Sequence, residues 1–116
     1  MSDKLRTTWT VVASASNSTA TATKSAPGAG KRLVLTGFSI SGSAAPAAAV
    51  AASIRSNGGA TTLETFQLPA SAFAPVVANY VHPLRCAENV DADITLAALG
   101  SGVTGTVVLK GFTEYC

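Results

Sequence analysis

The chain has 116 residues, and its composition does not shift along its length. One domain with one core is therefore expected over residues 1–116, and residues 1–4 are expected to form a flexible N-terminal arm. Charged residues make up only 12% of the chain, against about 25% in an average protein. The net charge is +2, and the basic residues are dispersed along the chain, which disfavours nucleic acid as a partner. The polar N-terminus and the lack of long apolar runs predict folding in a reducing cytoplasm and no membrane partner.

The N-terminal third of the chain predicts two strands in succession. Residues 5–15 are rich in Thr and Val, with Trp9 and Val11 on one face of a two-residue alternation that favours the core. Residues 19–23 alternate threonine with alanine, which suits a strand on an exposed or subunit-covered face.

Residues 31–41 carry the clearest strand pattern. Every second residue from Val34 to Ile40 falls on one face, including Phe38, whereas Leu33 and Leu35 fall on the other. A strand that is buried on both sides at one end is typical of a sandwich.

An alanine-rich stretch follows, and two structures are open for it. Residues 47–55 alternate as a strand would, but a segment that Pro46 opens could also begin a helix. We favour the strand, because residues 57–59 (Asn-Gly-Gly) supply the positive-φ positions of a hairpin turn and residues 61–68 form a plausible return strand.

The C-terminal part predicts a crossing loop and three further strands. Residues 69–79 hold two prolines and several alanines, which indicates a loop or a single helical turn. Residues 80–84 are broken by Pro83 and suit a short edge strand. A half-buried strand over residues 90–98 and a last strand over residues 103–115 complete the chain.

These patterns predict an all-β fold, an antiparallel β-sandwich of jelly-roll or Greek-key type with seven or eight strands. Phe38 and Ile94 each lie in the middle of an alternating apolar face and are expected in the core. Helix is expected in less than about 15% of the residues.

Residues 27–32 (Pro-Gly-Ala-Gly-Lys-Arg) have a weak likeness to a phosphate-binding loop. The pattern requires Gly where Ser25 stands and Ser or Thr where Arg32 stands, and it requires a helix to follow, whereas a strand is expected here. We therefore interpret the segment as a turn and expect no nucleotide cofactor.

His82 is the only histidine, so a nucleophile with a histidine base would have to use it. Catalysis by Cys86 with His82 would require a thiol of lowered pKa in a polar pocket, and a surface or interface histidine is the favoured alternative. Cys86 and Cys116 are expected to be free thiols in a reducing cytoplasm, although Cys116, the last residue, could cross-link subunits in an oxidising medium.

Glu88, Asp91 and Asp93 lie close together in the sequence, which makes a calcium site conceivable. The loop glycine and the ligand spacing of a calcium motif are missing, so a solvated strand face is favoured. The other carboxylates, Asp3, Glu64 and Glu114, are isolated. We therefore assign no catalytic, cofactor-binding or metal-binding residues and expect that the chain is not an enzyme.

Three segments resemble a known family, and they cover residues 30–41, 83–89 and 102–113. In their Thr- and Ala-rich pattern, and in a final strand that ends with Gly and an aromatic residue, they resemble small structural proteins of tailed-bacteriophage virions, the jelly-roll head-decoration or cement proteins. The resemblance implies a virion protein that binds the major capsid protein, forms homotrimers or homodimers and stabilises the assembled head. It does not separate head decoration from a tail or baseplate subunit.

The low charge fits such a role, because an uncharged surface limits repulsion between closely spaced copies. The main alternative is a carbohydrate-binding sandwich module. Such a site normally shows aromatic side chains beside clustered Asp and Asn, whereas Trp9, the only tryptophan, lies in an apolar alternation that indicates core.

Overall fold

A computed structural model describes residues 6–44, 46, 48–68 and 76–115. Strands dominate this part of the chain, and it contains no helix, so none that could cross a membrane. The strands are β1 (Arg6–Ser16), β2 (Ala20–Lys24), β3 (Lys31–Gly42), β4 (Val50–Ser56), β5 (Thr61–Leu68), β6 (Val76–Glu88), β7 (Ala92–Leu96) and β8 (Thr104–Tyr115). The predicted N-terminal arm lies outside the described residues.

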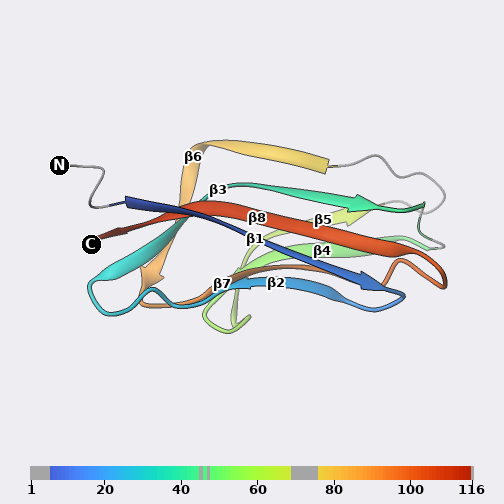
Figure 1. Cartoon of the computed structure of the whole chain (residues 1–116), viewed down its shortest axis with the longest axis horizontal. Helices are drawn as coiled ribbons and strands as arrows, with labels where there is room; N and C mark the ends of the chain where they lie inside the picture. Colours follow the sequence, from blue (N-terminus) through green and yellow to red (C-terminus); the bar gives the residue numbers. More distant parts are fainter. Residues whose placement is uncertain (1–5, 45, 47, 69–75, 116) are drawn as a thin grey trace.

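The strands form two antiparallel four-stranded sheets, with the orders β1-β8-β3-β6 and β2-β7-β4-β5. Figure 1 looks onto the first of these sheets, and β4 and β5 of the second lie behind it. Successive strands alternate between the sheets except at the β4–β5 hairpin, which is the jelly-roll arrangement. The predicted fold class is confirmed.

The core between the sheets is built from inward-facing residues of both. Phe38 and Ile94 are 2% and 0% exposed, as predicted, and the Phe38 ring lies 4.8 Å from that of Phe66 on β5. Ala20 and Ala22 of β2 are buried, while Thr21 and Thr23, which alternate with them, face solvent. Small inward residues let the flanking strand pack closely, which explains the Thr-Ala alternation.

The predicted faces of β3 are wrong in one respect. Leu35 pairs with Gly111 of β8, and Gly37 pairs with Lys110, the neighbour of Gly111. Thr36 therefore has no ladder partner on β8 and is an extra residue in β3. This β-bulge shifts the alternation by one, so Leu33 and Leu35 join Phe38 and Ile40 in the core cluster. Val34 is also buried, but outside that cluster.

The alanine-rich stretch is a strand from Val50 onward, whereas Ala48 and Ala49 precede the strand. β4 begins at Val50, three residues later than predicted, and Ala47 lies outside the described residues. The turn that follows has positive φ at Asn57 (56°), Gly58 (66°) and Gly59 (86°), which confirms the predicted hairpin.

β6 is much longer than predicted. It runs from Val76 to Glu88 and includes residues that were expected in a loop; the rest of that loop, residues 69–75, lies outside the described part. The strand is at the sheet edge, as expected, and it bends sharply in Figure 1. Leu35 pairs with Leu84 and Gly37 with Asn79, so the residues between Asn79 and Leu84, Pro83 among them, have no ladder partner on β3. Proline is tolerated here because the bulge needs no N–H donor from it.

Candidate binding surfaces

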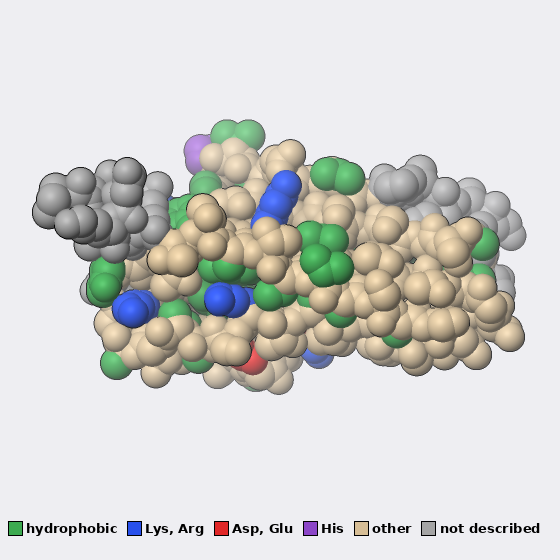
Figure 2. Space-filling model, in the orientation of Figure 1, with side chains coloured by type: hydrophobic (Ala, Val, Ile, Leu, Met, Phe, Trp, Pro, Cys, Tyr) green, Lys and Arg blue, Asp and Glu red, His purple; other side chains and the backbone are tan. Residues whose placement is uncertain are grey.

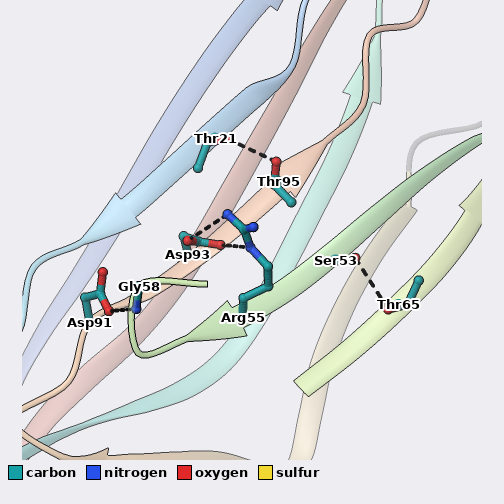
Figure 3. A network of polar contacts seen from close by, with 8 residues as sticks. All are labelled: Thr21, Ser53, Arg55, Gly58, Thr65, Asp91, Asp93 and Thr95. Carbon is teal, nitrogen blue, oxygen red and sulfur yellow. Dashed lines mark hydrogen bonds and ion pairs between the residues drawn. The ribbon is translucent and has the colours of Figure 1, made fainter. Parts of the chain in front are cut away.

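The carboxylates that suggested a calcium site are bound to other groups of the protein. Asp93 of β7 receives two hydrogen bonds from the Arg55 guanidinium of β4, at 2.9 and 3.1 Å, and Asp91 Oδ1 accepts the Gly58 N–H at 2.6 Å (Figure 3). Glu88 Oε2 accepts the Gly30 N–H at 2.6 Å. Among the described residues no group of three or more His, Cys, Asp or Glu side chains could hold a metal ion.

The predicted solvated strand face is wrong for Asp93, because this side chain is only 5% exposed. The Arg55 side chain on the neighbouring strand pairs with it, and burial without such a partner would be costly for a carboxylate. The hydrogen bond to Asp93 and the charges of Asp93 and Asp91 raise the pKa of Arg55 despite its partial desolvation. The Arg55–Asp93 ion pair therefore joins β4 to β7.

A second ionic cluster lies on the other sheet, where Glu114 of β8 is paired with two arginines. Arg32 Nη2 lies 2.6 Å and Arg85 Nε 3.4 Å from Glu114 Oε2. Desolvation alone would raise the pKa of Glu114, but hydrogen bonds and charge from the two guanidinium groups outweigh it and lower the pKa. Glu114, isolated in the sequence, thus joins β8, β3 and β6.

The structure gives no support to the Cys86 and His82 hypothesis. Cys86 is 5% exposed and belongs to the core cluster, and desolvation, with the charge of Asp91 in second place, raises the pKa of its thiol. His82 is exposed in the bulge of the edge strand. Cys86 is a free cysteine, whereas Cys116 lies outside the described residues.

The glycine-rich segment before Lys31 joins β2 to β3, so a strand follows it rather than a helix. The N–H groups of Gly28 and Gly30, the donors that a phosphate would need, are bonded to Asn89 Oδ1 at 2.9 Å and to Glu88. The segment is a turn with positive φ at both glycines.

The outer face of the β1-β8-β3-β6 sheet is partly apolar and carries few charged side chains besides Lys110 and the Glu114 cluster. Val12, Val108, Ser39 and Val77 are paired in register and form one row across all four strands, which we call the valine row. Val12 is 61% and Val77 64% exposed. Figure 2 shows a face of mostly uncharged side chains, with scattered hydrophobic groups and few blue or red ones. Val12 and Val77 lie outside the core cluster, so core packing does not require valine at these two positions.

The outer face of the other sheet is polar instead. Thr21, Thr95, Ser53 and Thr65 are paired in register, and their hydroxyl groups bond in pairs at 3.0 Å (Thr21 to Thr95) and 3.4 Å (Ser53 to Thr65), as Figure 3 shows. Together with the Arg55–Asp93 pair, this row leaves few unpaired donors for a ligand. The two faces of the sandwich therefore differ in character.

Most of the described aromatic side chains are buried or partly buried. Trp9 packs against the core cluster, as predicted, and the Lys24 Nζ lies 5.8 Å from its ring centroid. Among the described residues Tyr115 is the only aromatic counted as exposed, at 54%. A flat platform of several rings, of the kind that stacks on sugars, is not present in this part of the chain.

Neither family models nor curated proteins match this chain. Solved structures that are similar to this chain include a family 35 carbohydrate-binding module from an environmental isolate, at 14% identity, 87% coverage of this chain, 75% of the other and a TM-score of 0.48. PirA matches at 9% identity with coverage of 92% and 93% and a TM-score of 0.45. A subunit of Bacillus endospore appendages, disulfide-linked pili, matches at 12% identity with coverage of 96% and 87% and a TM-score of 0.42.

These three similarities give no link to bacteriophage proteins. None of their TM-scores reaches 0.5, so the function must be argued from the residues of this chain.

Proposed function

We propose that this chain is a non-enzymatic structural subunit that works by packing against other protein subunits, and specifically that it is a capsid decoration protein that binds an assembled phage head. The valine row is the observation that carries the packing role, while the phage head as the partner rests only on the family resemblance of residues 30–41, 83–89 and 102–113. The valine row places exposed β-branched side chains on a face with little charge, and such a face can approach another protein surface with a small desolvation cost.

The ionic side chains support the same role. Arg55, Asp93, Arg32, Arg85 and Glu114 are paired within the domain, and this reduces the charge offered to a partner. Contacts that exist only in the assembled particle would stabilise that particle by mass action. Closed homotrimers or homodimers are the assemblies that we expect first.

The experiment compares two variants of the purified protein. Val12→Lys/Val77→Lys places charge in the valine row at exposed positions, and Thr65→Lys places the same charge on the outer face of the other sheet. We expect light scattering to show an oligomer for the wild type and for Thr65→Lys, and a monomer for the double variant. Melting temperatures check that all three proteins fold.

Particle binding is measured by cosedimentation with heads that lack the protein. The double variant should bind at least about tenfold less than the wild type, which corresponds to about 1.4 kcal/mol. A wild type that is monomeric at every concentration, and that neither binds such heads nor protects them from heat, would contradict the proposal and bring the carbohydrate-binding alternative forward.

A further inference from the structure

A cleft of about 320 Å³ opens at the end of the sandwich where β1 begins and β8 ends. Its polar lining consists of Thr7, Lys24, Ser25, Lys31 and Thr113, and Ala26 and Pro27 complete the wall. Figure 2 shows blue side chains at this end of the molecule. The cleft joins three parts of the chain that are distant in sequence, namely β1, the β2–β3 connection and β8.

The polar groups in this lining are suited to an acceptor-rich, negatively charged ligand. Lysine can only donate, and the three hydroxyl groups can donate as well. Among the described residues, no carboxylate or amide side chain lines the cleft. A neutral ligand would leave two ammonium charges without a counter-charge.

Both lysines are available for such a ligand. Every ion pair among the described residues uses an arginine, so neither Lys24 nor Lys31 is paired with a carboxylate there. Each ammonium instead lies over an aromatic ring, Lys24 at 5.8 Å from the Trp9 centroid and Lys31 at 5.4 Å from that of Tyr115. Such contacts orient a lysine but leave N–H groups free to donate to an anion.

The β2–β3 connection that forms one wall is fixed by hydrogen bonds. The Gly28 and Gly30 N–H groups donate to Asn89 and Glu88, Lys31 N–H donates to Gly28 O at 3.2 Å, and Asn89 N–H donates to Lys31 O at 2.8 Å. The cleft is therefore largely formed before a ligand enters, which lowers the ordering cost of binding. Its volume is at the lower end of the range for small-molecule sites, about 300 to 1,000 Å³, so an anionic group on a body of about one sugar ring would fit.

We propose that this cleft binds a small oxyanion, a phosphate, sulfate or carboxylate group that is free or carried on a sugar. The site is separate from the valine row, so it does not depend on the assembly role. Lys24→Gln/Lys31→Gln removes both charges, and Lys110→Gln is the matched control, because Lys110 lies on the outer sheet face and does not line the cleft.

The test is a titration of the ¹⁵N-labelled full chain with sodium phosphate, sodium sulfate, sodium glucuronate and neutral glucose, at constant ionic strength set with chloride. We expect saturable amide shifts centred on Thr7, the residues from Lys24 to Ala26, Lys31 and Thr113. The dissociation constant should rise at least tenfold in the double variant and stay unchanged in Lys110→Gln, and glucose should give no shifts.

Tighter binding of glucuronate than of phosphate or sulfate would identify a sugar-borne carboxylate as the ligand, and the reverse order would identify an inorganic oxyanion. The proposal is overturned if no anion gives saturable shifts. It is equally overturned if the shifts grow linearly, spread over the whole surface and persist in the double variant. The melting temperature of the double variant without ligand shows whether it is folded.

Discussion

At the scale of single residues, Phe38 and Ile94 hold the two sheets together from opposite sides of the core. Phe38 comes from β3, and its ring contacts Phe66 of β5 at 4.8 Å and Tyr80 of β6 at 6.1 Å. Ile94 comes from β7 and is paired with Ala22 and Ile54 on the two neighbouring strands. Truncating either side chain would leave a cavity that close-packed neighbours can fill only in part.

We therefore expect Phe38→Ala and Ile94→Ala each to lower the free energy of unfolding by about 2 to 5 kcal/mol. The control is Val81→Ala, because Val81 is 89% exposed, and this change should stay within about 0.5 kcal/mol. Urea denaturation followed by circular dichroism measures all three. Wild-type midpoints for both core variants would show that the register of β3 and β7 is wrong.

Glu114 predicts how stability depends on pH. Because its pKa is lower in the folded state than the ordinary value of about 4.3, its contribution is present above that value and is lost as the pH falls through the folded-state pKa. Glu114→Gln should thus destabilise the protein at pH 7, with a difference that shrinks on acidification. Denaturation curves between neutral pH and about pH 2 test this, and a difference that does not vary with pH would contradict it.

At the scale of elements, β3, β6 and β8 meet where the bulge at Thr36 brings backbones close together. Gly111 of β8 lies beside this bulge and is paired with Trp9 of β1 and Leu35 of β3. A Cβ atom there would come within 2.0 Å of the Val34 carbonyl oxygen and 3.0 Å of Trp9 Cζ2. Only glycine allows this approach, because the obstacle is backbone.

Gly111→Ala should accordingly cost about 3 kcal/mol, at the upper end of the overpacking range. Gly105→Ala in the same strand is the matched control. A Cβ at Gly105 meets Leu96 Cδ2 at 2.8 Å and Leu99 Cδ1 at 3.3 Å, which are the ends of flexible side chains, so its cost should be about 1 kcal/mol. Chemical denaturation of both variants measures the difference, and equal costs would show that the backbone at the bulge can move.

At the scale of the whole molecule, the domain combines a well-filled core with a surface that carries little free charge. The ion pairs join strands within the sandwich, and Asp91 and Glu88 accept backbone N–H groups of the β4–β5 hairpin and of the β2–β3 connection. Assembly should then stabilise the folded state further, because a partner subunit binds only the native sheet face.

We expect the thermal midpoint of the wild type to rise as its concentration is raised from about 1 to 100 μM, since mass action favours the folded oligomer. The Val12→Lys/Val77→Lys variant should lose this dependence. Differential scanning calorimetry measures both proteins. A wild-type midpoint that does not vary with concentration would indicate that the isolated domain is the stable unit.

The sequence by itself determined the strand content, the sandwich class and the inward positions of Phe38 and Ile94, because a two-residue alternation and Gly- or Asn-rich turns are local signals. It also placed the β4–β5 hairpin, since Asn57-Gly58-Gly59 favours positive φ wherever it occurs.

Only the tertiary structure decided the features that depend on neighbouring strands. The bulge at Thr36 changes which side chains face the core, and it exists because β8 and β6 pair with β3 on either side. The Asp93–Arg55 pair, the Glu114 cluster and the cleft between Lys24 and Lys31 join residues from different strands or loops. Sequence spacing cannot show these contacts, because the order in which strands lie side by side is fixed by packing over the whole core and not by any local pattern.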